Sequence, residues 1–277
     1  MKQTPEQHIP NRPLVEIVLP VLNEQSALEC GVATLIGYLA HAFPYRWQIT
    51  IVDNGSEDDT WEIAQRLQRT HDNVDALRLT RRGRGLALRT AWLRSEADIV
   101  AYMDIDLSTG LESFLPLVAP LITGQRRIAT GSRLLTGATV TRGAKREIVS
   151  RAYNLLIHLL IPHRFSDAQC GFKALHSATA RELLPLVEDD RWFLDTELLL
   201  LAEERGYRIH EVPICWIEDT DSRVHIARTA REDVKGLLRV RAGRWQRRLG
   251  LTGLNARRST TLATKNRKHA KLPSMPQ

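Results

Sequence analysis

Two carboxylates close an apolar run in the stretch YMDIDLSTG, residues 102–110, at Asp104 and Asp106. In a β-strand, residues i and i+2 project to the same side, about 7 Å apart, so these two side chains would point to one place. Like charges repel there unless a cation or a proton lies between them. The pair therefore indicates a site for a metal or a proton, and the plainer alternative is a loop that begins a helix.

Three more polar segments follow predicted strands. The strands are predicted at 14–20, 47–53, 74–80 and 97–104, and the helices near 25–40, 59–70, 85–95 and 111–122. This alternation predicts an α/β fold with a mostly parallel, mixed sheet flanked by helices. Ligands of such sheets bind at the carboxyl ends of the strands, where the segments PVLNEQ, DNGSEDDT and RRGRGLALR follow the first three.

The chemistry of these segments suits a nucleotide with a diphosphate. PVLNEQ has no glycine, which argues against GxGxxG and P-loop phosphate sites. Asp53 can accept hydrogen bonds from a base or ribose, beside a tight turn at Gly55. In RRGRG, glycines let backbone amides approach an anion and arginines supply charge. Each segment alone could be a turn, a helix cap or a solvated loop, but together they predict a cleft for a metal-bridged diphosphate.

Composition favours one main globular domain. The chain has 277 residues, of which 43% are hydrophobic, and its three cysteines lack a CxxC spacing. We therefore expect no disulfide framework, no zinc site and a reducing, cytoplasmic location. The stretch MKQTPEQHIPNRP is too polar for a signal peptide, and the longest uncharged stretch, 30–45, is too short and too polar to span a bilayer.

The charge is distributed unevenly along the chain. From Arg223 onward there are 15 Lys and Arg against 2 Asp and Glu, whereas the rest has 24 against 30. The run VKGLLRVRAGRWQRRLGL suits anionic phospholipid headgroups, and a solvated basic helix with a disordered end is the alternative. The predicted parts are a flexible N-terminus at 1–13, a catalytic domain at 14–222, a basic amphipathic helix at 223–250 and a basic disordered tail at 251–277.

The ordered segments PVLNE, DNGSEDDT, RRGRGLALR and MDIDLST resemble the motifs of family 2 glycosyltransferases, which have the GT-A nucleotide-sugar fold. ATGSRL, REIVSRAYNLL, DAQCGFKAL, RWFLDTELL, GYRIHEVPICW and DSRV make the chain most similar to the dolichyl-phosphate and polyprenyl-phosphate sugar synthases, in particular their glucosyl branch. The resemblance covers residues 14 to about 241. It implies a metal-dependent inverting transferase that moves glucose from UDP-glucose to a lipid phosphate; mannose, N-acetylhexosamines and GDP donors stay open.

The resemblance also implies roles for individual residues. On the donor side, the nucleotide is expected to be bound by Pro20, Glu24 and Asp53. The ribose and diphosphate of the donor are expected to be bound by Gly83, Arg84 and Asp104. Those expected to hold Mg²⁺ or Mn²⁺ are Asp106 and Asp104, which suits a hard cation that keeps ligand positions for water and phosphate. The acceptor phosphate is expected to be held by Arg133 and Arg146. The sugar and acceptor side is also expected to be bordered by Gln169, Asp195 and Glu197.

Several alternatives concern the acceptor and the class of protein. A lipid phosphate is anionic near pH 7 and needs arginines to position it, whereas an alcohol needs a base, for which Asp195 is the candidate. Asp195 and Glu197 could instead be ordinary polar residues that open the helix TELLLLAEERG. A nucleotidyltransferase would carry a glycine-rich loop after the first strand. Nucleic-acid binding would call for aromatic residues on a basic platform, and only 6% of the chain is aromatic.

The chain departs from the family pattern at four positions. Arg81 and Arg84 stand in place of an asparagine and a lysine, Gly110 in place of a proline, and Ala168 in place of a threonine. A fixed guanidinium in place of an ammonium could alter how the diphosphate is held.

Membrane contact is the remaining expectation. Relatives often carry transmembrane helices at one end, and none is predicted here, so we expect peripheral contact with the cytoplasmic face of an anionic membrane. The segment YNLLIHLLIPHRF would enter the interface through Leu155, Leu156, Leu159 and Leu160. The alternative, which we favour for this segment, is a buried core helix.

Overall fold

The computed structural model describes residues 12–141, 143–217 and 226–248, except for the side chains of 144–146, 226–230 and 246–248. Strands and helices alternate through the first half of the chain. They are β1 (Leu14–Val21), α1 (Leu28–Ala42), β2 (Arg46–Asp53), α2 (Thr60–Thr70), β3 (Val74–Arg78), α3 (Arg84–Arg94) and β4 (Ile99–Met103). The four predicted strands and the helices between them are all present, with ends that differ from the prediction by at most three residues.

The second half is less regular. It contains a 3-10 turn (Leu111–Ser113), α4 (Phe114–Ile122), β5 (Ile128–Ser132), β6 (Thr139–Thr141), α5 (Ala144–Leu160), β7 (Phe172–His176), α6 (Ser177–Leu183), a second 3-10 turn (Leu184–Leu186), α7 (Leu194–Glu204), β8 (Ile209–Pro213), β9 (Cys215–Ile217) and α8 (Ile226–Arg248). The predicted helix at 111–122 is thus a 3-10 turn that continues into α4.

The main sheet has seven strands in the order β3-β2-β1-β4-β7-β5-β8. All neighbours pair in parallel except β7, which runs antiparallel to both β4 and β5. The chain moves outward from β1 to β3 and then returns to β4 on the other side of β1. The carboxyl ends of β1 and β4 therefore flank a topological switch point, which is where ligands bind in such sheets.

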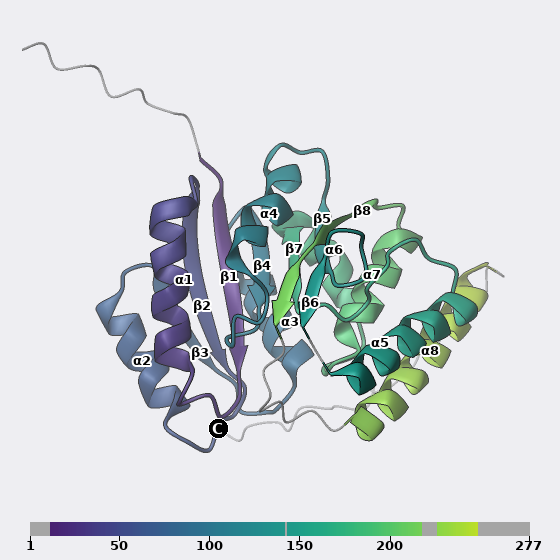
Figure 1. The fold of residues 1–277 in the computed structure, drawn as a ribbon, viewed down its shortest axis with the longest axis horizontal. Coiled ribbons are helices and arrows are strands. Elements are labelled where there is room, and N and C mark those ends of the chain that lie inside the picture. Colours follow the sequence, from purple (N-terminus) through teal and green to yellow (C-terminus); the bar gives the residue numbers. More distant parts are fainter. Residues whose placement is uncertain (1–11, 142, 218–225, 249–277) are drawn as a thin grey trace, which may run out of the picture.

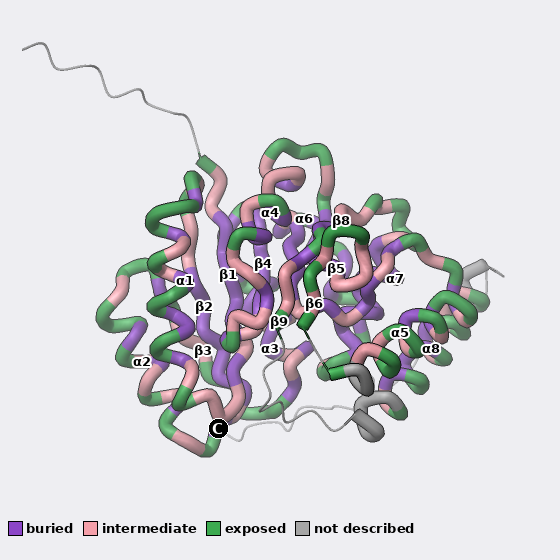
Figure 2. The backbone as a smooth tube through the Cα atoms, in the orientation of Figure 1, coloured by how far each residue is buried: buried purple, intermediate pink, exposed green. Residues whose placement is uncertain are grey.

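An apolar layer on each face of the sheet holds the helices in place. Alternation along β1 sends Val15, Ile17 and Leu19 to one face and Val18 to the other. Helices α1, α2 and α4 contribute to the first layer, and α3, α6 and α7 to the second (Figure 1). The strands are buried at the centre while the helices turn exposed sides outward (Figure 2). This arrangement confirms the predicted α/β fold class.

Helices α5 and α8 lie side by side at one end of the molecule (Figure 1). Leu237 and Val240 of α8 and Ile157 of α5 belong to the second apolar layer. The part of α8 that carries these residues is therefore packed into the body of the protein.

The outer side of α5 corrects one expectation. Leu155 and Leu159 are 58% and 72% exposed, so the favoured prediction of a buried core helix is wrong for this side. Leu156 and Leu160 instead pack against the second apolar layer, so they are not available to an interface. The helix is half-buried because its leucines are distributed over both sides.

A two-stranded parallel sheet of β6 and β9 holds the loop that follows β4. Thr109 bridges Trp216, Gly110 N donates to Cys215 O at 2.9 Å, and Ile217 N donates to the Ser108 carbonyl at 2.9 Å. The loop after the two carboxylates is thereby held along β9.

None of the helices in the described part of the chain is both long and apolar enough to cross a membrane. Residues 1–11 of the predicted N-terminal segment and the whole predicted tail, 251–277, lie outside the described residues.

Candidate active site

Hydrogen bonds join the predicted segments at the carboxyl ends of β1, β2 and β4. Asn23, after β1, accepts a hydrogen bond from Glu57 N at 2.8 Å. Asn54, after β2, accepts one from Gly83 N at 2.7 Å. The fourth segment joins through Arg84, the first residue of α3. The four segments thus meet at one edge of the sheet, as their positions after the strands predicted.

The predicted nucleotide side is formed by the ends of β1 and β2. Pro20 lies in β1 beside Val52, next to the register pair that contains Asp53. Asp53 is fully buried; its Oδ1 accepts a hydrogen bond from Ser56 N (3.0 Å), and its Oδ2 forms an ion pair with Arg78 Nε (3.1 Å) that lacks hydrogen-bond geometry. A buried carboxylate with spare acceptor capacity suits a ligand that donates hydrogen bonds, as a base or a ribose does.

Glu24 begins the connection to α1. Its backbone N–H donates to Thr60 Oγ1 at 2.8 Å, and its carbonyl accepts from the backbone of Ala27 and Leu28. These bonds fix the backbone at the mouth of the predicted nucleotide side.

The paired carboxylates are set by a turn and not by a strand. Because β4 ends at Met103, the expectation that Asp104 and Asp106 project from one side of a strand is wrong. Leu107 N donates to Asp104 O at 3.2 Å, which closes a turn with a positive φ of 50° at Leu107. Asp106 Oδ1 accepts a hydrogen bond from Ser108 N at 3.0 Å.

Gly171 leaves the room that the Asp104 carboxylate occupies. A Cβ atom at position 171 would overlap Asp104 Oδ2 and would also crowd Arg84 Nη2. The loop before β7 therefore approaches the carboxylate as closely as a backbone can. Asp104 keeps 44% of its side chain exposed, so it can still contact a ligand.

Arg84 connects Asp104 to a second carboxylate in the interior. Its guanidinium donates to Asp104 Oδ1 at 2.7 Å and to Asp195 Oδ2 at 2.9 Å, and it stacks on the rings of Tyr102 and Trp192. Burial alone would lower the pKa of Arg84, but the charge of Asp104 and the other acidic groups raise it well above its ordinary value. This position therefore carries a fixed positive charge.

Asp195 is the centre of a buried network. Its Oδ1 accepts a hydrogen bond from the Tyr102 hydroxyl and lies 3.1 Å from Lys173 Nζ, while its Oδ2 is paired with Arg84. Lys173 is itself fully buried and donates to Cys170 O at 2.6 Å. Asp195 is thus an ion-paired interior residue, not an ordinary polar residue that opens a helix.

The glycines of RRGRG lie against the backbone of residues 190–191. A Cβ atom at Gly83 or Gly85 would overlap the backbone of Asp190 or Arg191, and Leu86 N donates to Asp190 O at 2.9 Å. Residues 190–191 can therefore approach this loop closely only because both positions are glycine. The acidic side chain of Asp190 also pairs with two arginines of this region, Arg81 and Arg89.

On the predicted acceptor side, Arg133 is held by Asp167, a residue that the sequence interpretation missed. Arg133 Nε and Nη2 donate to the two oxygens of Asp167 at 2.7 and 2.9 Å, and the guanidinium stacks on Trp216. Burial would raise the pKa of Asp167, but Arg133 lowers it below its ordinary value. The charge of Asp104 also acts on Arg133, so the two lie within electrostatic reach. The signal in the sequence was only an acidic residue two places before Gln169.

Gln169 and Glu197 each contact α8. Gln169 Nε2 donates to Asp233 Oδ2 at 2.7 Å, and Glu197 Oε2 accepts from Arg239 Nη2 at 2.7 Å. Arg146 lies in the first turn of α5, but its side chain is outside the described set, so its predicted role stays a prediction.

The described side chains form no group of three or more His, Cys, Asp and Glu that could hold a metal. Asp104 and Asp106 supply hard oxygen ligands at the edge of the site, and one of these carboxylates is half exposed. This fits a divalent cation whose other ligands are phosphate oxygens and water.

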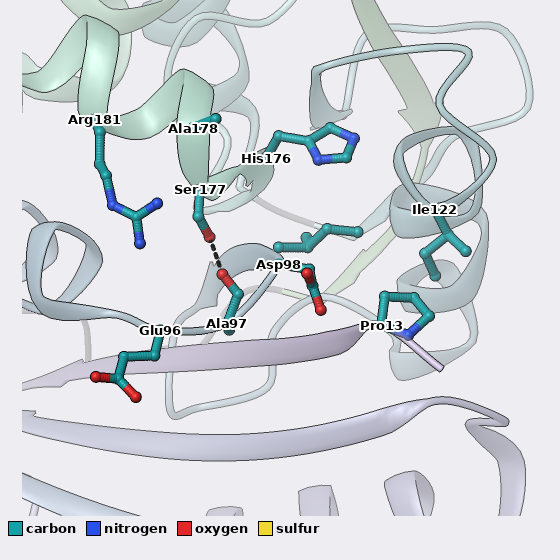
Figure 3. A pocket seen from close by; sticks show the side chains of 10 residues that line it. Pro13, Glu96, Ala97, Asp98, Ile122, His176, Ser177, Ala178 and Arg181 are labelled. Atoms are coloured by element: carbon teal, nitrogen blue, oxygen red, sulfur yellow. Dashed lines mark hydrogen bonds between the residues drawn. The ribbon is translucent and has the colours of Figure 1, made fainter. Parts of the chain in front are cut away.

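A pocket of about 430 Å³ lies at the opposite edge of the sheet, where β1 and β4 begin (Figure 3). Several of its polar side chains are bonded to the backbone: Ser177 Oγ donates to Ala97 O, Arg181 Nη2 donates to Ser95 O at 2.7 Å, and Asp98 Oδ2 accepts from Leu14 N at 2.9 Å. These bonds anchor the turn before β4, so the pocket is separate from the candidate active site.

Comparison with known proteins agrees with this geometry. The family model "Glycosyl transferase family 2" matches residues 16–184. Dolichyl-phosphate beta-glucosyltransferase ALG5C of Trichomonas vaginalis is 30% identical, over 85% of this chain and 74% of that protein. Glycosyltransferase AglD of Haloferax volcanii is 35% identical over 77% of this chain, but the match covers only 35% of that protein.

A solved structure supports the fold. Glucosyl-3-phosphoglycerate synthase from Mycobacterium tuberculosis, in complex with UDP, has a TM-score of 0.62 at 23% identity and covers 83% of this chain and 80% of its own. From the family match and the site at the switch point of the sheet, we conclude that this chain is an enzyme that belongs to glycosyl transferase family 2.

Proposed function

We propose that this protein transfers glucose from UDP-glucose to a polyprenyl phosphate such as dolichyl phosphate, with inversion at the anomeric carbon. The names of the dolichyl-phosphate beta-glucosyltransferases among its relatives support both the sugar and the acceptor. The UDP donor is the finer part of the proposal and rests on the resemblance of the motifs to the glucosyl branch.

The observation that carries the acceptor class is the state of Asp195. Both of its oxygens are engaged, by Tyr102, Lys173 and Arg84, and its side chain is only 3% exposed. A carboxylate held in this way is poorly placed to remove a proton from an alcohol. A phosphate acceptor is already anionic near pH 7 and requires no such base.

The reaction is then a single displacement. An oxygen of the lipid phosphate forms a bond to the anomeric carbon, and the bond from that carbon to the β-phosphate oxygen breaks, so that UDP leaves with the electron pair. Arg133 and Arg146 are the residues proposed to bind the incoming phosphate, and Asp53, Glu24 and Pro20 the nucleotide. The enzyme thereby brings the lipid phosphate close to the diphosphate of the donor. The repulsion between these two anions costs free energy, which fixed arginines offset.

Asp104 and Asp106 are the residues proposed to hold Mg²⁺ or Mn²⁺. When bound there with the diphosphate, such a cation would neutralise the charge that develops on the leaving UDP. Arg84 keeps Asp104 oriented, and Gly171 keeps the loop before β7 from displacing it.

Peripheral contact with an anionic membrane completes the proposal. Ile148, Leu155 and Leu159 on α5 and Leu238 and Trp245 on α8 are all more than half exposed. The neighbouring Lys235 and Arg241 are exposed as well, and the sequence continues with further basic residues. Exposed apolar side chains among basic ones suit the headgroup region of an anionic bilayer. We place this contact on the cytoplasmic side, where nucleotide sugars are made.

The proposal is tested by following radiolabelled glucose from UDP-glucose into a polyprenyl phosphate in detergent, with Mg²⁺ or Mn²⁺ or with EDTA. Label should enter the lipid with wild-type enzyme and metal. It should be absent with EDTA, with unphosphorylated polyprenol and with the Asp106→Ala variant.

Two results would contradict parts of the proposal. Metal-dependent release of UDP to an alcohol acceptor, without labelled lipid, would support an alcohol as acceptor with Asp195 as base. Labelled lipid from GDP-mannose but not from UDP-glucose would retain the acceptor and overturn the donor.

A further inference from the structure

Helix α8 turns two ionisable side chains inward, beside the apolar residues that hold it. Asp233 is 2% exposed, and its Oδ2 accepts the hydrogen bond from Gln169 Nε2. Its Oδ1 is buried and has no hydrogen-bond partner among the described residues. One helical turn and a half further on, Arg239 reaches Glu197. Burying a carboxylate costs free energy unless hydrogen bonds or a paired charge offset the loss of water.

The first contact reaches the loop on the acceptor side, residues 167–171. Gln169 is its central residue, and Gln169 N also donates to Asp167 Oδ1 at 3.3 Å. Asp167 in turn holds Arg133 with two hydrogen bonds. At the other end of the loop, Gly171 lies against the Asp104 carboxylate. A shift of the loop would therefore move the proposed acceptor arginine.

The second contact reaches the segment on the donor side, residues 188–192. Glu197 Oε2 accepts hydrogen bonds from Glu188 N at 3.2 Å and Asp189 N at 3.0 Å, besides the one from Arg239. The next residue, Asp190, accepts the hydrogen bond from the first turn of α3 and pairs with Arg89 of that helix and with Arg81 before it. At the end of the segment, Trp192 stacks on Arg84.

We propose that α8 is a positioning element of the active site, in which Asp233 sets the 167–171 loop and Arg239 sets the 188–192 segment. Apolar side chains would attach a helix to a core at least as well as buried charges do, so these two contacts specify position more than they add stability. A third contact, Arg191 Nη1 to Glu232 Oε1 at 2.7 Å, ties the same segment to α8. The assignment of the two sides to acceptor and donor rests on the proposed function.

Four variants of the full chain test this inference. Asp233→Leu removes the acceptor of the Gln169 hydrogen bond, and Asp233→Asn keeps an oxygen for it. Arg239→Met removes the charge that faces Glu197. Arg231→Met makes the same change at an exposed position of the same helix and serves as the matched control.

Hydrogen exchange of the free enzyme and steady-state kinetics are then compared. Asp233→Leu should speed amide exchange in 167–171 and raise the KM for polyprenyl phosphate about tenfold, with the KM for UDP-glucose changed less than about twofold. Arg239→Met should speed exchange in 188–192 and raise the KM for UDP-glucose by a similar factor. Arg231→Met should behave as the wild type in both measurements, and Asp233→Asn should keep both wild-type KM values without faster exchange in 167–171.

The inference is wrong if Asp233→Leu and Arg239→Met lower the melting temperature while both KM values stay at those of the wild type, because α8 would then be structural only. Unchanged exchange in both loops would overturn it as well. A wild-type enzyme that transfers no sugar contradicts the proposed function instead, and the exchange measurement still decides whether α8 holds the two loops.

Discussion

At the scale of single residues, the site depends on side chains that fix other side chains. Asp104, the one half-exposed carboxylate of the buried network, is held by Arg84 on one side and bordered by the backbone of Gly171 on the other. The position of a proposed metal ligand is thus set by a guanidinium and by a missing side chain.

Gly171→Ala should lower kcat/KM for sugar transfer by about a hundredfold, because the added methyl group would displace the Asp104 carboxylate from its place. The protein should stay folded, since Asp104 can move toward solvent. Activity and urea unfolding of the variant are compared with those of Gly37→Ala, whose Cβ atom meets nothing within 4 Å. This control should keep full activity and gain up to about 1 kcal/mol of stability. Wild-type turnover by Gly171→Ala would contradict the role given to this contact.

Residues in local motifs could be found from the sequence, and their partners could not. Asp53 and Asp104 end predicted strands and Arg84 directly precedes a predicted helix, so their place at one edge of the sheet followed from the strand pattern. Asp167 was missed because it pairs with Arg133 across 34 positions, with no local signal. The two carboxylates of MDID were correctly placed after β4, but the turn at Leu107 makes their geometry different from that of a strand.

At the scale of elements, α8 contributes a carboxyl group that titrates in an unusual range. Burial is the main cause that raises the pKa of Asp233 to about 6; the Gln169 amide opposes this shift, and the nearby acidic residues Asp189, Glu232 and Asp195 contribute to it. In the unfolded chain the pKa would be about 3.9. Between these two values the folded protein keeps a proton that the unfolded chain releases, so the stability from this group is complete below about pH 3.9 and is lost as the pH rises through 6.

Asp233→Asn should therefore become more stable than the wild type as the pH rises from about 4 to about 7, by up to about 3 kcal/mol in the free energy of unfolding. The measurement is urea unfolding of both proteins across this range. His163, His176 and His210 have lowered pKa values because of burial and destabilise both proteins in acid, so only the difference between the two curves is used. If the free energies of unfolding of the two proteins changed in parallel with pH, the result would contradict the interior position of a charged Asp233.

The elements themselves were largely predictable, whereas their contacts were not. The sequence pattern predicted the first four strands and the helices between them, because the central strands are short apolar runs that are buried on both faces and the helices have a buried and an exposed side. It did not reveal that residues 190–191 approach Gly83 and Gly85, since that contact joins segments about 100 positions apart in the chain. The reversed direction of β7 is likewise set by tertiary packing, and its sequence looks like any buried strand.

At the scale of the whole molecule, charge and exposed apolar surface coincide at the end formed by α5 and α8. The exposed apolar residues described there include Ile148, Leu155 and Leu159 on α5 and Leu238 and Trp245 on α8. The acidic part of the sequence precedes Arg223, and the basic part includes α8. A negatively charged bilayer would therefore attract one end of the protein and repel the rest, which orients it.

The protein should sediment with vesicles of phosphatidylcholine and phosphatidylglycerol at low NaCl, and less at high NaCl, because salt screens the contribution of the basic residues. Leu155→Asp combined with Leu159→Asp should weaken sedimentation at both salt concentrations. Leu93→Asp, at an exposed leucine of α3, is the matched control and should sediment as the wild type does. Equal sedimentation of the double variant and the wild type would exclude α5 from the contact.

The reversed strand β7 has a consequence for how such a chain can diversify. Because β7 runs against its neighbours, the loop that precedes it reaches the same edge of the sheet as the turn that follows β4. The residues of this loop before Gly171 can thus vary without altering β1, β2 or the segments that follow them, while Gly171 itself is kept by its contact with Asp104. Under the proposed function, substitutions there would change the acceptor while recognition of the nucleotide is inherited intact, so new specificities would arise in one half of the chain at a time.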